Sequence, residues 1–416
     1  LAFMRMPLGV ALGLVGVVGF SELSNYKAGM ANAARLVIDS GQSYNLSVVP
    51  LFILMGLMVD RGGMAKELYR AAYTFLGHRR GGLAMSTIVA CGMFSAICGS
   101  SLATAATMSK VSMPEMRRYK YHDSLATASI AAGGTLGILI PPSVILVIYG
   151  LITNASVGKL FIAGVLPGLI GVLFYLAAVL FVVTRNPDAG PAGDRSTWRE
   201  RLVALRDVWT TLGLFIFVIG GIYVGAFTPT EAAGMGAAGA IAIAFFRGAL
   251  TWKVVLDVCR ETTLTTAKLF LVVFGALIFS NFVNRAGLPD ALLDIAQSFD
   301  IGALGVIFVI ILIYLLLGCV FESLSMILLT VPIFAPLVEG LGYDLIWFGI
   351  LVVVATEISL ITPPIGMNVF VLKGVLNDVS VGTIFKGVTP FWVADIFRIL
   401  LIALVPGIAL LLPSMM

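Results

Sequence analysis

Two hydroxyl-rich interruptions of apolar sequence carry the residues of this chain that could do chemistry. The first is the stretch 94–104, FSAICGSSLAT, and the second is 319–325, CVFESLS. A Pro-Pro pair follows each of them about forty residues later, at 141–142 and at 363–364. The two Pro-Pro pairs are 222 positions apart, and the two interruptions align at the same offset. This shared register predicts two copies of one membrane-buried structural unit.

The residue types in both copies suit a transported sodium ion. Hard cations take oxygen ligands, and a site that must release its ion favours neutral hydroxyls and carbonyls over clustered carboxylates. A proline within a helix removes an amide donor and breaks the helix, so each Pro-Pro pair should free carbonyl oxygens. The oxygens expected in the first copy belong to Ser95, Cys98, Gly99, Ser100, Ser101, Thr104, Gly137 and Ile140. Those expected in the second belong to Ser323, Ser325, Thr356, Ser359 and Thr362. The alternative is that small residues simply permit tight helix packing.

The same interruptions could also hold an anion. Helix N-termini offer unpaired amides and partial positive charge, and no Lys or Arg lies near either interruption in the sequence. Glu322 is the one acid there, and an ionisable residue inside a membrane is a functional candidate. It could ligate a cation, carry a proton or set specificity; the alternative is a structural hydrogen bond. We expect the anion to lie between the first interruption and Glu322-Ser323.

Composition places the chain among polytopic membrane proteins. It has 416 residues, of which 59% are hydrophobic and 12% charged, with a mean hydropathy of +1.05. The four cysteines form no Cys-x-x-Cys pair, which argues against a disulfide framework or a zinc site. The net charge of +4 lies mostly in loops without interleaved aromatics, so the expected surroundings are membrane lipids and not nucleic acid.

Two re-entrant hairpins and two broken helices are predicted within the apolar segments. Segments 83–97 and 102–111 are short for a crossing, so they form the arms of the first hairpin, and 303–337 forms the second. Helices at 126–151 and 345–372 should break at their Pro-Pro pairs. Non-helical backbone at membrane depth is tolerated only where protein or a cavity covers it, so the hairpin tips should line a site.

The expected fold class is an all-α polytopic membrane protein with two inverted repeats, each holding one hairpin and one broken helix. The loops that flank the first hairpin are basic, with Arg79, Arg80, Arg117 and Arg118, whereas those of the second hairpin contain acids and no base. By the positive-inside rule the first hairpin enters from the cytoplasm and the second from the other side. Inverted repeats of this kind are typical of secondary transporters.

Five segments follow from this interpretation, with a polar linker at 185–207 between the two halves. They are scaffold helices with an interfacial helix at 1–82, the first hairpin and broken helix at 83–156, scaffold and connecting helices at 157–302, the second hairpin and broken helix at 303–374, and a C-terminal span at 375–416. The two hairpin segments together would form a transport domain.

The other charged residues in apolar segments are interpreted as structural. Glu357, Lys268 and the pair Asp395 and Arg398 are expected to be paired or interfacial. Glu231 stands where a helix cap is expected, three residues after a threonine and two after a proline.

Other classes of membrane protein fit less well. Both histidines, His78 and His122, lie in loops, so an intramembrane enzyme would lack a base at depth. No P-loop is present, so ATP bound to this chain does not drive transport. A channel is disfavoured because paired hairpins place sites between gates and not along an open pore.

An ordered set of motifs resembles the large membrane subunit of tripartite ATP-independent periplasmic (TRAP) transporters over nearly the whole chain. The motifs are Phe94-Ser95-x-x-x-Gly99-Ser100, Pro141-Pro142-Ser143 with Tyr149-Gly150, Phe161-Ile162-Ala163-Gly164-x-x-Pro167-Gly168, Thr228-Pro229-Thr230-Glu231 and Thr362-Pro363-Pro364-x-Gly366. The resemblance implies a bacterial inner-membrane importer of organic anions that is coupled to sodium. It also implies an elevator motion, in which a domain with both hairpins slides against a scaffold.

The resemblance implies particular site residues. One sodium site would lie at Ser95, Cys98, Ser100, Gly137, Ile140 and Pro142, and a second at Ser323, Thr356, Thr362, Gly366 and Met367. The anion would contact Ser101, Thr104, Pro141, Glu322, Ser323, Pro363 and Asn368. Related proteins often have Ser at the position of Cys98, a harmless difference if this residue contributes its carbonyl oxygen.

Two partners follow from the resemblance: a periplasmic substrate-binding protein and a small four-helix membrane subunit, which is either a separate polypeptide or lies upstream of Leu1. The expected cargo is a small carboxylate or sulfonate. The alternative is a sodium/dicarboxylate symporter of related fold that needs no binding protein.

Overall fold

The computed structural model describes residues 6–298, 302–318 and 321–416, without the side chains of 96–97 and 296–298. All elements in these ranges are helices, and seven of them are long and apolar enough to cross a membrane. The all-helical membrane class predicted from the sequence is therefore confirmed.

Four helices precede the first hairpin. They are α1 (Leu8–Leu23), α2 (Tyr26–Gly41), α3 (Val48–Arg61) and α4 (Met64–Leu76), with the short 3-10 helix η2 (Tyr44–Ser47) before α3. The Asn25 side chain caps α2, accepting a hydrogen bond from the amide of Ala28 at 2.8 Å. Most of α2 is exposed, in keeping with the interfacial helix expected in this part of the chain.

The first hairpin and broken helix follow in the predicted order. They comprise α5 (Gly82–Cys98), α6 (Ser101–Arg118), α7 (Asp123–Thr135), the 3-10 turn η3 (Leu136–Ile138) and α8 (Val144–Thr153). Gly99 ends α5 with a φ of 63°, a conformation that glycine adopts without strain, and Ser100 caps α6. The second arm is longer than the predicted 102–111, because α6 continues through Pro114 to the basic end of the hairpin.

Four helices connect the two hairpin units: α9 (Val157–Arg185), α10 (Trp198–Tyr223), α11 (Pro229–Phe246) and α12 (Trp252–Arg285), with η4 (Pro187–Ala189) after α9. The polar linker predicted at 185–207 is shorter in the structure. Its last ten residues are helical because Thr197 and Glu200 form a capping box at the start of α10. A second capping box, between Thr228 and Glu231, starts α11 and confirms the capping role predicted for Glu231.

The second half of the chain follows α12. Its elements are α13 (Leu288–Ser298), α14 (Ala303–Leu317), α15 (Ser323–Gly340), α16 (Leu345–Ser359), α17 (Met367–Val375), α18 (Val381–Leu404), α19 (Gly407–Leu410) and η5 (Pro413–Met415). Both α6 and α15 have 18 residues. The gap between α16 and α17 contains the second Pro-Pro pair, as predicted. Cys319 and Val320, at the second tip, lie outside the described residues.

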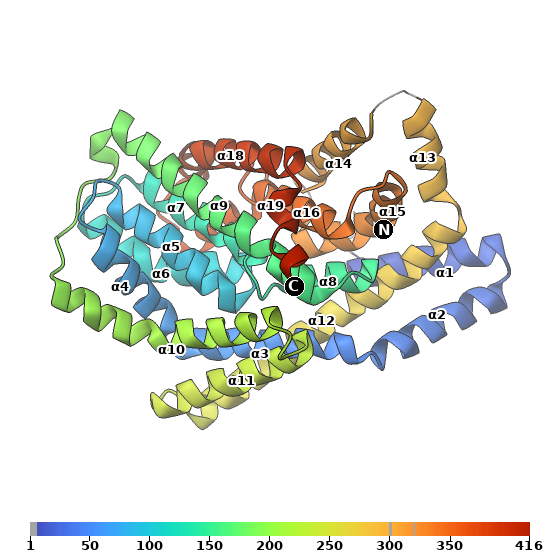
Figure 1. The fold of residues 1–416 in the computed structure, drawn as a ribbon, viewed down its shortest axis with the longest axis horizontal. Helices are drawn as coiled ribbons and strands as arrows, with labels where there is room; N and C mark the ends of the chain where they lie inside the picture. Colours follow the sequence, from blue (N-terminus) through green and yellow to red (C-terminus); the bar gives the residue numbers. More distant parts are fainter. Residues whose placement is uncertain (1–5, 299–301, 319–320) are drawn as a thin grey trace.

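The helices form two groups, which can be followed in Figure 1. In the outer group α12 packs against α1, α2 and α3, and α11 packs against α3 and α10. In the inner group the two hairpin units interlock, with α8 of the first against α15 of the second, and α17 of the second against α6 of the first. Long-range hydrogen bonds join the units, from Tyr149 Oη to the carbonyl of Leu345 (2.6 Å) and from Asn368 Nδ2 to the carbonyl of Ala131 (2.9 Å).

A buried ion cluster fastens the inner group to α9 and α18. Arg398 of α18 contacts Glu357 of α16 and Asp395 of its own helix, and all three side chains are fully buried. Tyr175 of α9 donates a hydrogen bond to Asp395 and is joined to the Thr135 hydroxyl at 2.9 Å. The prediction that these charged residues are paired is confirmed. Lys268, by contrast, is exposed on α12.

Candidate functional site

A cavity of about 260 Å³ lies where the two hairpin tips meet the outer helices. The first tip contributes residues 98–103 and the second contributes Glu322, Ser323 and Leu324. The start of α8 and part of α12 complete the wall. Two interruptions that are 222 residues apart in the sequence therefore share one cavity, as the sequence predicts.

The first tip packs against the break in the first broken helix. A Cβ atom placed on Gly137 would lie 3.0 Å from Ser95 Oγ and 3.3 Å from the carbonyl oxygen of Ser100. A Cβ atom on Gly99 would lie 3.2 Å from the carbonyl oxygen of Pro142. One hydroxyl and at least two backbone carbonyls thus gather where the sequence places the first sodium site.

The Ser95 hydroxyl is the clearest sign that this junction holds a ligand. It is fully buried and has no hydrogen-bond partner among the described residues. A buried hydroxyl without a hydrogen-bond partner lowers the stability of the fold and is uncommon. The position of the Ser95 hydroxyl beside carbonyl oxygens therefore indicates a ligand. By contrast Ser86, nine residues earlier in α5, donates to the Gly82 carbonyl at 2.7 Å. An oxygen-preferring cation would use the free Ser95 oxygen.

One side chain forms hydrogen bonds with the backbone on both sides of the Pro-Pro break. Ser143 caps α8, accepting from the Leu146 amide, and its hydroxyl also donates to the carbonyl of Ile138 across the break. The side chain of Ile140 packs toward Gly168 of α9, where a Cβ atom would lie 2.8 Å from it. Ile140 can therefore serve the first site only through its backbone carbonyl.

A second junction lies where α14 ends beside the end of α16. Ser359, the residue 222 positions after Gly137, packs directly on Gly318 at the end of α14. Thr356 Oγ1 and Thr362 Oγ1 donate to carbonyls of their own helix turns, both at 2.8 Å, so each hydroxyl keeps lone pairs for a cation. Gly366 has a φ of 58° and lies against the Thr362 carbonyl, and Met367 begins α17 directly after it.

The structure divides the predicted site residues by position. Those that line the cavity are Cys98, Ser100, Ser101, Glu322 and Ser323. Those that do not line it, and lie at the two junctions or in the hairpin arms, are Ser95, Thr104, Gly137, Ile140, Pro141, Pro142, Thr356, Thr362, Pro363, Gly366 and Met367. Asn368 is buried, and its amide nitrogen binds α7 while its Oδ1 has no hydrogen-bond partner in the part of the chain that the structure describes. Its place is the interface between the two units, and it does not line the cavity.

The sequence interpretation missed the outer wall of the cavity. Glu261, Thr265 and Leu269 contribute one face of α12, and Ile53 and Leu57 contribute α3. The three α12 residues recur every four positions, so they lie on one side of a helix. No role was predicted for Glu261 from the sequence, although its four-residue spacing to Thr265 and Leu269 was an available signal.

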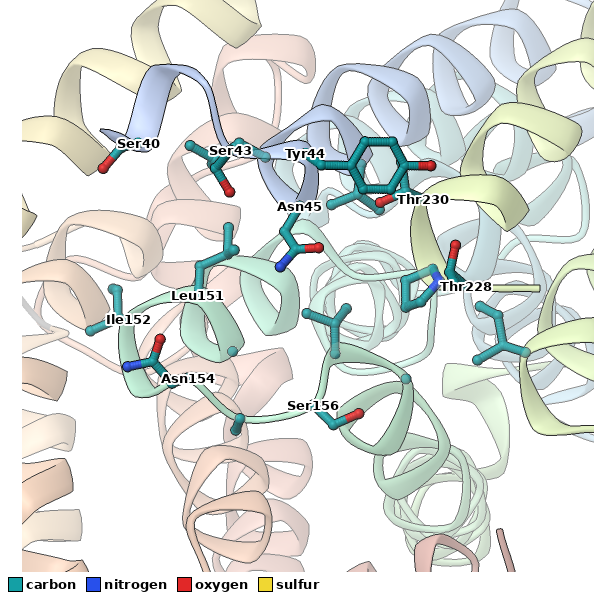
Figure 2. A pocket seen from close by; sticks show the side chains of 18 of the residues that line it. Ser40, Ser43, Tyr44, Asn45, Leu151, Ile152, Asn154, Ser156, Thr228 and Thr230 are labelled. Atoms are coloured by element: carbon teal, nitrogen blue, oxygen red, sulfur yellow. The ribbon is translucent and has the colours of Figure 1, made fainter. Parts of the chain in front are cut away.

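A second and larger cavity, of about 830 Å³, lies among η2, the end of α8, the start of α11 and α12 (Figure 2). Its wall is rich in hydroxyls and amides, among them Ser43, Asn45, Asn154, Ser156 and Thr228. It includes Val273 and Leu277 of α12, which lie about 18 to 24 Å along the helix axis from Glu261. The helix α12 therefore borders both the cavity between the tips and this second cavity, at different points along its length.

No group of three His, Cys, Asp or Glu side chains that could hold a metal is found in the described part of the chain. The described cysteines Cys91, Cys98 and Cys259 are free thiols.

Paired hairpins, broken helices and a cavity between the tips define the chain as a polytopic membrane protein with a transporter fold. A solved structure with this fold is that of MtrF from Neisseria gonorrhoeae, described as one of a class of antimetabolite efflux pumps. The TM-score is 0.63 and the identity 13%, covering 90% of this chain and 83% of that one.

The sequence comparisons identify the family. The family model of the DctM component of tripartite ATP-independent periplasmic transporters matches residues 1–408. The sialic acid TRAP transporter large permease protein SiaM of Vibrio cholerae is 34% identical over 100% of this chain and 96% of that protein. The C4-dicarboxylate TRAP transporter large permease protein DctM of Pseudomonas aeruginosa is 34% identical over 97% of this chain and 94% of that protein. The chain belongs to this family of large permeases, and it is a multi-pass inner-membrane protein.

Proposed function

We propose that this chain imports a small organic acid with sodium as the coupling ion. The observation that carries the proposal is the junction of Ser95, Gly137 and the Ser100 carbonyl directly behind a cavity formed by both hairpin tips. Sodium would bind the buried oxygens of the junctions, while the acid would occupy the cavity. Binding of the ion would fix the tip geometry and so raise affinity for the acid, which is the coupling that symport needs.

The cargo class follows from the relatives and from the tips. The two relatives are named for sialic acid and for C4-dicarboxylates, which are organic acids. The helices α6, α8 and α15 all begin at the cavity wall, and helix N-termini favour a carboxylate. We propose that a periplasmic binding protein delivers the acid and that a small four-helix membrane subunit completes the permease.

An elevator movement is the proposed mechanism. The inner group would slide along α12, carrying the cavity between the tips from one side of the membrane to the other. Two features support this: α12 borders both cavities at different points along its length, and the two hairpin units interlock reciprocally as inverted repeats would.

Uptake by the purified permease in proteoliposomes tests the function. We expect accumulation of the acid only with an inward sodium gradient, the small subunit and the loaded binding protein. Sodium-driven uptake without any binding protein would instead favour a self-sufficient symporter. Ser100→Ala and Ser323→Ala should each weaken sodium activation, and unchanged activation in both variants would refute the assigned sites.

A further inference from the structure

A third cavity, of about 330 Å³, lies between the inner and outer groups of helices. Val89 and Met93 of α5 and the side chain of Ile140 line it from the inner group, and Leu212 of α10 lines it from the outer group. Helices α4 and α9 complete the wall, and all its described lining residues are apolar except Thr211. An apolar cavity of about 150 Å³ already stays dry and takes up an apolar guest. This larger one suits an apolar ligand.

The cavity opens to the membrane-facing surface of the protein. Leu169 of α9 lines it and is 55% exposed, and α9 is long and apolar enough to span the membrane. An exposed leucine on such a helix faces lipid. Within residues 82–95 of α5, Val89 and Met93 are the only ones that are not buried, and both line the cavity. A lipid chain that enters past Leu169 would therefore reach a part of α5 that is otherwise covered by protein.

The Thr211 hydroxyl is the polar feature of this cavity. The side chain is fully buried, and its Oγ1 has no hydrogen-bond partner among the described residues. A threonine in a helix can donate to the carbonyl four residues earlier, as Thr356 does. The corresponding carbonyl, that of Asp207, instead accepts from Arg247 Nη2 at 3.1 Å. The Thr211 hydroxyl is thus left to a ligand that carries a hydrogen-bond acceptor.

Charged residues stand one turn before Thr211 in α10. Guanidinium nitrogens of Arg206 and of Arg70 in α4 each lie 4.0 Å from a carboxylate oxygen of Asp207, so two positive charges share one carboxylate. Trp209 is 64% exposed, and exposed tryptophans gather at the membrane interface. Thr211 therefore lies just below the level of the headgroups, where phospholipids have their ester carbonyls. The surplus positive charge suits a lipid phosphate.

We propose that this cavity binds one phospholipid. An ester carbonyl of the lipid accepts a hydrogen bond from Thr211, the attached acyl chain fills the cavity as far as Val89 and Met93, and the phosphate lies toward Arg70 and Arg206. The chain contacts both α5 of the inner group and α10 of the outer group, so the bound lipid stabilises the arrangement of the two groups in this structure. This site does not depend on the cargo or on the coupling ion.

A photoreactive phospholipid tests the site. The permease is placed in nanodiscs of phosphatidylethanolamine and phosphatidylglycerol that contain a phosphatidylethanolamine with a diazirine on one ester-linked acyl chain. Illumination should label Val89 or Met93 of α5, and peptide mass spectrometry locates the adducts. Leu173 of α9, which is 62% exposed and does not line the cavity, serves as the reference for labelling by bulk lipid.

Filling the cavity should exclude the chain. Leu212→Trp fills it from α10 and Val172→Phe fills it from α9, so the two variants do not share one folding defect. We expect each to lower labelling of α5 relative to Leu173 by at least about tenfold, since overfilling a packed space commonly costs that much. The matched control is Leu180→Trp, on the exposed side of α9, which should leave labelling of α5 unchanged.

The role of Thr211 is tested by competition between two unlabelled lipids. One is the ester-linked phospholipid, and the other is its ether-linked analogue with the same chains and headgroup but no carbonyl. The ester lipid should displace the probe from α5 about fivefold better, as expected for one hydrogen bond of ordinary strength. Thr211→Val, which keeps the side-chain shape, should remove this difference. Thr184→Val, which removes an exposed hydroxyl bonded to the Phe181 carbonyl, should retain it.

Four outcomes would overturn the proposal. Labelling of α5 could be absent from the wild-type permease, or it could persist in both cavity-filling variants. Labelling of α5 only when the small membrane subunit is left out would show that this subunit, and not a lipid, occupies the cavity. Equal displacement by the ester and ether lipids in the wild-type permease would show that Thr211 does not bind the ester carbonyl.

Discussion

Gly137 lies directly against Ser95, so that a methyl group on the glycine would stand 3.0 Å from the serine hydroxyl oxygen. The Ser100 carbonyl oxygen would be 3.3 Å from the same methyl group. The first hairpin and the broken helix therefore pack so closely at this point that a side chain at position 137 would crowd both oxygens. This relationship joins a hairpin tip to a helix break about forty residues later in the chain.

Gly137→Ala should abolish sodium binding while leaving the fold intact. The added methyl group would occupy the space among Ser95, Ser100 and the helix break, where the ion is proposed to sit. We expect sodium activation of uptake to fall by at least tenfold, which corresponds to about 1.4 kcal/mol. The control is Gly374→Ala in α17, where a methyl group meets no atom within 4 Å. Equal sodium activation in both variants would contradict the assignment.

Ser95→Ala should separate a ligand role from a structural one. Removing a buried hydroxyl that has no partner does not sacrifice a hydrogen bond, so stability without sodium should be unchanged or slightly higher. Stabilisation by sodium should be lost. Ser86→Ala in the same helix removes a bond to the Gly82 carbonyl and should leave the sodium effect intact. Thermal unfolding with sodium or choline as the cation measures both, and a retained sodium effect in Ser95→Ala would exclude a ligand role.

The buried cluster around Arg398 predicts an asymmetry between two substitutions. Arg398→Met leaves the carboxyl groups of Glu357 and Asp395 buried without a cation, a loss of about 3 to 5 kcal/mol. Glu357→Gln keeps an acceptor for the guanidinium and balances the charge of Arg398 against Asp395. We expect a strongly lowered unfolding temperature for the first variant and little change for the second. Similar destabilisation by both would show that the charge balance of the cluster does not matter.

Asp60 and Thr107 offer a test of the elevator movement. Asp60 ends α3 in the outer group, Thr107 lies in α6 of the inner group, and their side-chain oxygens are 3.2 Å apart. If the inner group slides, Asp60→Cys combined with Thr107→Cys should form an oxidant-dependent cross-link that blocks uptake. Reduction should restore uptake.

Each single variant treated with the same oxidant serves as the control for that cross-link, since the native cysteines are present in all of them. Full uptake by the cross-linked protein would show that α6 and α3 do not move past one another during transport.

Several features of the fold followed from local sequence alone. Gly99 and the Pro-Pro pairs end helices for stereochemical reasons that require no neighbour, so the breaks were predicted at the right positions. The polar linker was predicted to be too long, because the charged residues of its second half are typical of a loop. In the structure Thr197 and Glu200 cap a helix there. The hydroxyl content of the tips was equally visible, and it predicted the type of ligand.

The sequence by itself determined the membrane class, the two copies of the hairpin and helix break, and the oxygen-rich chemistry of the tips. These depend on composition, local geometry and a constant offset between residues. Only the tertiary structure decided that Glu261 and Thr265 of α12 complete the cavity, that Ser95 faces Gly137, and that Glu261 pairs with Arg61. Such contacts depend on which face of one helix packs against another, and periodicity within a single helix does not specify its partner.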